Sequence, residues 1–181
     1  MSIERIIFSL LSLFLFGCEG ADNELKDNFN KLQTVEYVDI DRFMGDWYVI
    51  ANIPTFIEKR ATNAIESYKL DSDGNINTEF TFYQDSPNGK LKRYNPKGFI
   101  FNKETNAEWR MQFIWPIKMP FLIIDLSDDY RYTVIGEPNR KYLWIMARNH
   151  KISDFDFDQI TGNLHNVGYD TSLIRKVIQD W

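Results

Sequence analysis

The stretch Gly45-Asp46-Trp47-Tyr48-Val49-Ile50-Ala51 decides how this chain folds. From Trp47 to Ile50 every residue is aromatic or β-branched, which predicts a strand that begins near Trp47. Gly45 has no Cβ, so the backbone can turn sharply into that strand. A tryptophan after such a turn is, on its own, equally well explained as an ordinary core residue.

Further strand-like segments follow this stretch at regular spacing, with turn residues between them. The expected strands are residues 47–53, 64–70, 76–83, 91–101, 107–115, 121–126, 130–136 and 142–148. Asn95-Pro96 is expected to break the fourth strand with a bulge. No helical crossover separates the strands, so the sequence predicts an all-β fold, an eight-stranded up-and-down antiparallel barrel.

Alternating apolar side chains indicate which face of each strand points inward. The alternation is clearest in strands 76–83 and 107–115. It fits either a filled core or a hollow interior that holds one small ligand. In the hollow case we expect ligand contacts from Phe80, Phe82, Trp109, Met111, Phe113, Trp115, Tyr132 and Val134.

The N-terminal part of the chain has the pattern of a targeting segment. Arg5 precedes an apolar run, Ile6 to Phe16, that is too short for a comfortable membrane span. The run leads into Cys18, the only cysteine, so no internal disulfide can form. We expect residues 1–17 to be a signal peptide, residues 18–36 a polar flexible tether, and residues 37–181 one domain. A secretory signal with an incidental cysteine, or a short membrane anchor, is the alternative.

The strand pattern and two flanking motifs resemble the lipocalins, most closely the bacterial lipoprotein lipocalins. The motifs are Gly45-Asp46-Trp47, with Ile53-Pro54-Thr55-Phe56 after it, and the segment from Tyr142 to Arg148. The resemblance implies a hollow barrel, with Trp47 at its closed end and Arg148 packed across the indole.

The resemblance also places a helix outside the barrel. Ser153 is a good N-cap, and Gly168 is expected to end the helix after Val167. In the same family a short last strand lies beside the first strand, and we expect it at Val177-Ile178-Gln179.

Leu15-Phe16-Gly17-Cys18 resembles the lipobox of bacterial lipoproteins. Gly17 supplies the small residue before the cysteine, whereas Phe16 is bulkier than the pattern usually shows. The resemblance implies that Cys18 carries palmitate and other acyl chains. Glu19 is not the aspartate linked with inner-membrane retention, so we expect an outer-membrane anchor with the domain in the periplasm. Some bacterial relatives dimerise, which leaves a homodimer open.

Composition and motifs argue against several other functions. The net charge of −5 does not suit general nucleic-acid binding. Asp154-x-Asp156-x-Asp158 imitates a calcium loop, but Gln159 stands where that loop needs glycine, so a helix start is the better interpretation. We therefore expect no metal and no cofactor, and no acid–base pair is evident on the inward stripes. A protein that is not an enzyme is predicted.

The sequence thus predicts a membrane-anchored protein that holds fatty acids, lysophospholipids or phospholipids, for lipid storage, transport or envelope maintenance. An enzyme on a lipocalin-like barrel and a filled-barrel interaction module are the alternatives. The loops expected at the barrel mouth carry an excess of basic residues, including Lys59, Lys118 and Arg140. We expect this mouth to face anionic membrane lipid, with scattered surface charge as the alternative.

Overall fold

The computed structural model describes residues 31–181. The predicted signal peptide, Cys18 and the first part of the predicted tether lie outside the described residues. Val35 already belongs to the folded domain, because its N–H donates to the carbonyl of Ile123 at 2.9 Å. In the described part of the chain, no helix combines the length and the apolar character needed to cross a membrane.

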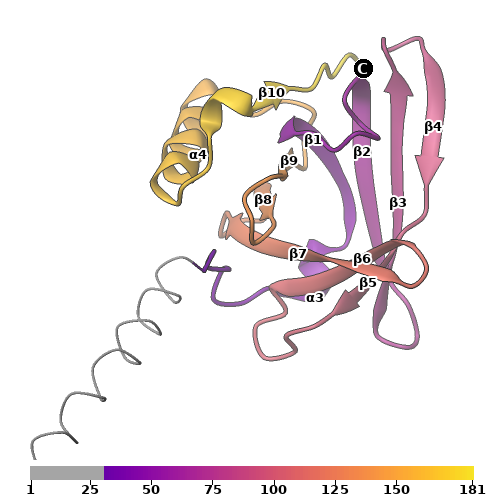
Figure 1. The fold of residues 1–181 in the computed structure, drawn as a ribbon, viewed down its shortest axis with the longest axis vertical. Coiled ribbons are helices and arrows are strands. Elements are labelled where there is room, and N and C mark those ends of the chain that lie inside the picture. The colour runs from indigo at the N-terminus through magenta and orange to yellow at the C-terminus, as the bar shows by residue number, and fades with distance from the viewer. Residues whose placement is uncertain (1–30) are drawn as a thin grey trace, which may run out of the picture. The chain divides into compact units, whose positions relative to one another are not determined.

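The domain is an antiparallel barrel closed between its first and last long strands (Figure 1). The long strands are β1 (Gly45–Ile53), β2 (Ala61–Leu70), β3 (Asn75–Gln84), β4 (Lys90–Tyr94), β5 (Lys97–Ile100), β6 (Glu108–Ile114), β7 (Ile117–Leu126), β8 (Tyr132–Gly136) and β9 (Leu143–Ala147). Strands β4 and β5 are the two halves of the predicted fourth strand. The prediction of an eight-stranded up-and-down barrel is therefore confirmed.

The break between β4 and β5 falls at Asn95-Pro96, where the sequence predicts it. Strand β5 pairs with both β3 and β6, whereas β4 pairs with β3 alone among the described strands. The outer edge of β4 is thus open. Its charged residues, Lys90, Lys92 and Arg93, are of the kind that discourages a sheet edge from pairing with another chain.

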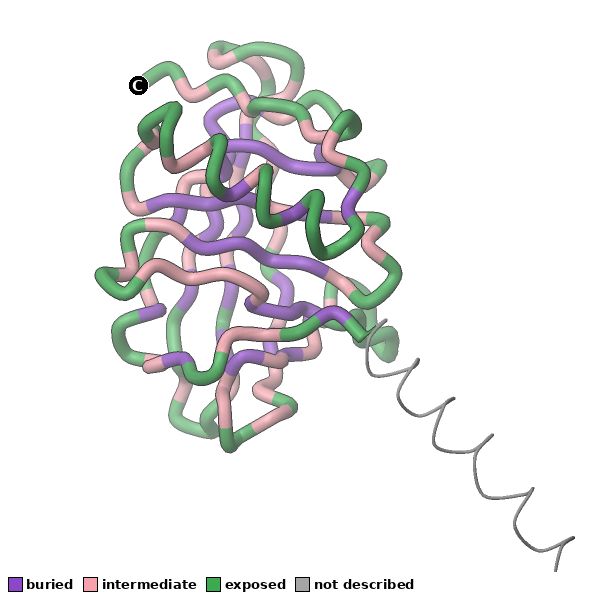
Figure 2. The backbone as a smooth tube through the Cα atoms, turned by 90° about the vertical axis from the view of Figure 1, so that its left-hand side faces the viewer, coloured by how far each residue is buried: buried purple, intermediate pink, exposed green. Residues whose placement is uncertain are grey.

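Helix α4 (Asp154–Asn166) lies outside the barrel, as expected (Figure 1). The Ser153 hydroxyl accepts the N–H of Asp156 at 3.0 Å, and Gly168 takes a φ of +90° after the last turn. The buried residues of the helix are Ile160 and Leu164. In Figure 2 most of the remaining residues of α4 are coloured as exposed, in front of strands with many buried residues.

The last strand differs from its predicted position. After the 3-10 helix η1 (Thr171–Leu173), β10 (Arg175–Lys176) pairs with Ala51 and Asn52 of β1. The prediction of residues 177–179 is therefore wrong by two positions, although the N–H of Val177 still donates to the carbonyl of Ile50 at 2.9 Å. The prediction relied on apolar residues, but the two residues that form this strand are exposed, so apolar character could not locate it.

Candidate ligand-binding site

One end of the barrel is closed by packed aromatic rings. Helix α3 (Ile40–Phe43) crosses this end and inserts Phe43 (Figure 1). The Phe43 ring lies 5.1 Å from Trp47, 5.8 Å from Tyr68 and 5.4 Å from Trp109, measured between ring centroids. All four side chains are buried, so this half of the barrel has no room for a ligand.

Arg148 covers the closed end from outside. Its guanidinium carbon lies 3.8 Å from the centroid of the Trp47 ring, the arrangement that the resemblance implies. Its nitrogens donate to the backbone carbonyls of Arg42, Phe43, Met44 and Asp46 at 2.7 to 3.1 Å. The guanidinium thus satisfies carbonyls around the end of α3 that the short helix leaves without partners.

Gly45 explains why the chain can turn at this point. Its φ is +96°, a conformation that side chains with a Cβ rarely adopt. An added Cβ would also lie 3.4 Å from a nitrogen of Arg148. The first residue of the motif therefore permits both the turn into β1 and the close approach of the arginine.

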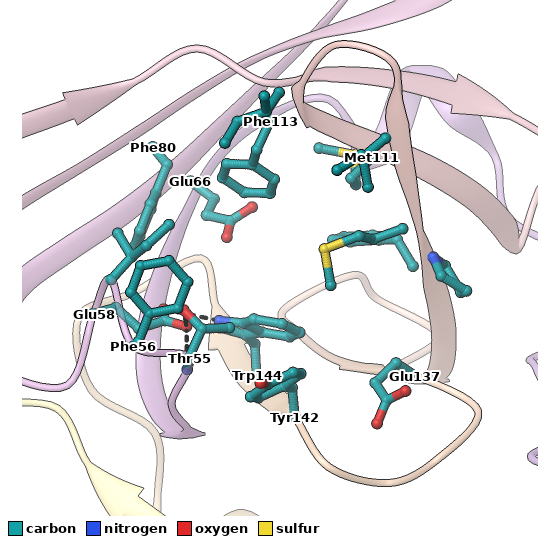
Figure 3. A pocket seen from close by; sticks show the side chains of 16 residues that line it. Thr55, Phe56, Glu58, Glu66, Phe80, Met111, Phe113, Glu137, Tyr142 and Trp144 are labelled. Carbon is teal, nitrogen blue, oxygen red and sulfur yellow. Dashed lines mark hydrogen bonds between the residues drawn. The ribbon is translucent and has the colours of Figure 1, made fainter.

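The opposite half of the barrel is hollow and holds a cavity of about 240 Å³ (Figure 3). Its walls are mostly apolar and aromatic. The lining residues are Thr55, Phe56, Ile57, Glu58, Glu66, Phe80, Met111, Phe113, Ile114, Ile117, Met119, Pro120, Phe121, Glu137, Tyr142 and Trp144. Phe121 also stacks on Trp109 at 5.3 Å, so the aromatic cluster of the closed end forms the cavity floor.

The rim of the cavity exposes large apolar side chains. Phe56 is 81% exposed and Ile117 is 62% exposed, and both line the opening. Trp115, in the turn between β6 and β7 that leads into Ile117, is 83% exposed. Exposed apolar side chains gathered at an opening are unusual on a water-facing surface and mark a contact or binding surface.

Three of the predicted ligand-binding residues, Phe80, Met111 and Phe113, line the cavity. Two others face inward without reaching it. Trp109 belongs to the closed-end cluster, and Phe82 stacks with Tyr94 at 6.1 Å. These two residues therefore lie outside the cavity lining, because facing inward is not enough when half of the interior is filled.

Trp115, Tyr132 and Val134, also expected as ligand contacts, do not line the cavity either. Trp115 lies in the β6–β7 turn, beyond a register shift between Met111 and Ile114 that ends the strict alternation. Ile135 belongs to the interior cluster, so Val134, its neighbour in β8, points to the outer face on which α4 lies. Tyr132 shares that outer face.

The three predicted mouth charges have separate positions. Lys59 is exposed in the connection between β1 and β2, at the cavity end. Lys118 belongs to β7 instead of a loop, and its Nζ lies 3.6 Å from the Phe99 ring centroid. Arg140 donates from Nε to the carbonyl of Val167 at 2.6 Å, at the end of α4. The three residues therefore do not form one basic ring.

Two buried glutamates, Glu58 and Glu66, are features of the cavity that the sequence analysis missed. Glu58 is 4% exposed and holds the β1–β2 connection, since it accepts from Thr55 at 3.0 Å and from Trp144 Nε1 at 2.9 Å. Glu66 is 7% exposed and accepts from the hydroxyl of Tyr68. Alternation could have found Glu66, because Ala64, Glu66 and Tyr68 share one face of β2.

Both glutamates have raised pKa values. Loss of water raises the pKa of Glu66 to about 7, against the lowering effect of the Tyr68 hydrogen bond and with a smaller rise from the charge of Glu58. Burial likewise raises the pKa of Glu58, although its hydrogen bonds with Trp144 and Thr55 oppose the rise. The cavity thus contains a carboxyl group that changes its charge near neutral pH. Within residues 31–181 no group of three His, Cys, Asp or Glu residues could hold a metal ion.

A closed barrel that is filled at one end and hollow at the other defines the class of barrels that bind one small apolar ligand. The chain belongs to the lipocalin family, because residues 38–179 match the family model described as a lipocalin-like domain. This confirms the resemblance seen in the Gly45–Trp47 and Tyr142–Arg148 motifs.

Known relatives include plant and bacterial proteins. The chain is 27% identical to temperature-induced lipocalin-1 of Arabidopsis thaliana, over 82% of this chain and 83% of that protein. It is 24% identical to the outer membrane lipoprotein Blc of Vibrio cholerae, over 97% of this chain and 99% of that protein. Among solved structures, insecticyanin of the tobacco hornworm Manduca sexta has a TM-score of 0.66, at 18% identity and with 83% and 84% of the two chains covered. This last likeness supports the fold alone.

Proposed function

We propose that this lipocalin is a membrane-anchored, non-enzymatic lipid-binding protein that holds an apolar chain of a fatty acid, lysophospholipid or phospholipid. Its role would be lipid storage, transport or envelope maintenance. The observation that carries the proposal is the cavity of about 240 Å³ with apolar walls and an open, apolar rim. Pockets that enclose a drug-sized ligand are roughly 300–1,000 Å³, so this cavity suits one chain better than two.

The same cavity weighs against the filled-barrel interaction module. A filled barrel would continue the ring packing of Phe43, Trp47 and Trp109 to the other end, whereas here that packing stops at Phe121. The enzyme alternative would use Glu58 or Glu66 as an acid or base. Both oxygens of Glu58 already accept hydrogen bonds from the protein, and its role is therefore to hold the β1–β2 connection.

Lipids that co-purify with the full-length protein test the proposal directly. Mass spectrometry of an organic extract should find single-chain or double-chain lipids in near-stoichiometric amount, and native mass spectrometry of the same sample reports whether a homodimer forms. Met111→Glu places a charge in the cavity wall and should remove the bound lipid. Leu91→Glu, on exposed β4 outside the cavity, is the matched control. Lipid retained by a folded Met111→Glu protein would show that it binds elsewhere.

The anchor is proposed at Cys18, which follows Gly17 in a lipobox-like sequence. A bacterial relative of similar length carries the name outer membrane lipoprotein, which supports an outer-membrane location with the domain in the periplasm. Radiolabelled palmitate should label the parent protein and leave Cys18→Ala unlabelled. Persistent labelling of Cys18→Ala would refute the anchor without affecting the cavity.

A further inference from the structure

Glu66 is the one glutamate of the cavity whose carboxyl group the protein leaves partly unsatisfied. Its Oε2 accepts from the Tyr68 hydroxyl, and within residues 31–181 its Oε1 has no hydrogen-bond partner. Figure 3 shows this carboxyl group pointing into the space between Phe80, Phe113 and Trp144. The carboxyl group therefore borders the cavity with an oxygen that can accept a hydrogen bond or an opposite charge from a ligand.

The other two glutamates of the lining do not offer such an acceptor. Glu58 is saturated by Thr55 and Trp144. Glu137 accepts the backbone N–H groups of Asn139 and Lys141, and thereby closes the turn between β8 and β9. A ligand that enters the cavity therefore meets Glu66 as its available polar contact at depth.

The charges around the cavity decide which ligand group Glu66 would accept. The lining contains three glutamates and no lysine, arginine or histidine. A carboxylate or phosphate placed beside Glu66 would meet like charge and no neutralising partner. An ammonium group would meet an opposite charge, and aromatic faces such as those of Phe80, Phe113 and Trp144 also attract cations.

We propose that Glu66 is a ligand contact and that the cavity selects single-chain apolar amines, whose ammonium group pairs with the Glu66 carboxylate at the cavity floor. This inference rests on the proposed function, because it requires the cavity to accept an apolar chain. It adds amines to the ligand classes proposed above and ranks them first, and a fatty acid that enters the cavity would have to keep its carboxylate at the mouth. Folding has already removed Glu66 from water, so only the ligand's ammonium group loses hydration on binding.

Four titratable or charged groups are relevant to the ionisation of Glu66. Tyr68 donates to it from the same strand, Glu58 faces it from the β1–β2 connection, and Glu137 lines the cavity from the β8–β9 turn. Arg148 acts on Tyr68 from the closed end. The pKa of Glu66 is about 7. An amine binds the ionised form, so its affinity should rise about tenfold between pH 6 and pH 8 and then level off.

The test compares octylamine, octanol and octanoate, three soluble probes with the same chain length, by calorimetric titration of the purified full-length protein. At pH 8 we expect octylamine to bind at least tenfold more tightly than octanol, and octanoate to bind most weakly. Glu66→Gln should reduce octylamine affinity at least tenfold and change octanol affinity less than threefold. Glu104→Gln removes the same charge from an exposed loop and is the matched control.

The outcomes separate the two proposals. If octanol binds the parent but octylamine has no advantage, the amine preference is wrong and the lipid-binding cavity stands. If no probe binds, both proposals fail. The pH profile of the unmutated protein keeps the inference testable even if Glu66→Gln does not fold, because octylamine affinity that is constant from pH 6 to pH 8 would overturn it.

Discussion

At the closed end of the barrel Trp47 is fully buried beneath Arg148, whereas at the open end Trp115 is 83% exposed in a turn. Both ends are rich in aromatic side chains. At the closed end the rings pack against one another, and at the open end they surround a space or face outward. Aromatic content alone therefore does not indicate a pocket, because a pocket forms only where no neighbouring strand or helix fills the space.

Polar groups differ between the two ends in the same way. Arg148 satisfies four carbonyls at the closed end and is itself satisfied by them. Glu66, at the floor of the open half, has one hydrogen bond from Tyr68 and an oxygen that faces the cavity. We therefore expect substitutions at the closed end to lower the free energy of unfolding. Substitutions at the open end should mainly change ligand binding and the pH dependence of stability.

Replacing the tryptophan at each end should give the largest contrast. Trp47→Ala removes a fully buried indole and should lower the free energy of unfolding by about 3–5 kcal/mol. Trp115→Ala should change the free energy of unfolding by less than about 0.5 kcal/mol, since its side chain is exposed. Urea unfolding followed by circular dichroism measures both. Similar losses for the two variants would contradict the division into a filled and a hollow half.

The second prediction concerns pH. The folded-state pKa of Glu66 is about 7, above its ordinary value of 4.5, so the folded protein holds a proton that the unfolded chain releases. The stabilisation is complete below pH 4.5 and is lost as the pH rises through 7, by about 3 kcal/mol for this group. Glu58 adds a loss in the same direction, because burial raises its pKa too.

Glu66→Gln cannot ionise and should keep more of its stability at pH 8 than the parent protein. Thermal unfolding at pH 5 and pH 8 gives the comparison, with exposed Glu104→Gln as the control. A parent protein and a Glu66→Gln protein with parallel pH profiles would mean that Glu66 does not titrate as proposed.

The third prediction weakens the closed end by a smaller amount. Arg148→Ala leaves carbonyls of α3 and β1 without their charged donor, and should lower the free energy of unfolding by about 2 kcal/mol. Arg148→Lys should restore part of this loss, because lysine keeps the charge without the planar fork. Arg93→Ala, which breaks an exposed ion pair with Glu79, is the control and should cost at most about 1 kcal/mol.

The smallest expected effect belongs to the rim. Trp115→Ser should reduce binding of the protein to lipid vesicles by about fivefold, since partial burial of an indole contributes roughly 1 kcal/mol. Co-sedimentation of the Cys18→Ala form, which lacks the proposed anchor, isolates this contribution. Phe155→Ser, an exposed aromatic of α4 away from the rim, serves as the control. Equal losses of vesicle binding for both variants would indicate non-specific hydrophobic adsorption instead of a membrane-facing mouth.

Much of the closed end could be predicted from the sequence. The Gly45-Asp46-Trp47 motif and Arg148 lie at fixed places relative to the strands, and hairpin connections leave few ways to arrange eight sequential strands. Helix α4 was predictable from Ser153 and Gly168, because a helix cap depends only on the residues at the helix end.

The open end was decided by tertiary structure. A bulge or register shift of one residue reverses which side chains face inward, and such shifts occur beyond Met111 in β6 and near Ile123 in β7. Facing inward did not distinguish Trp109, in the packed cluster, from Met111, in the cavity wall. That distinction depends on how far the rings of α3 and four strands reach into the barrel.

Alternation, turns and caps act over a few residues, so the strands, their order and the closing motif follow from the amino-acid sequence. Which half of the barrel is hollow, and that Glu66 is an acid within it, depends on how the strands pack together. The alternation of β2 already placed Glu66 on the inner face, but burial without a full set of partners is a property of the assembled walls. A pKa near 7 requires removal of water, and the cavity lining around Glu66 is assembled from other strands: Phe80 from the paired strand β3, and Phe121 from β7, far along the chain.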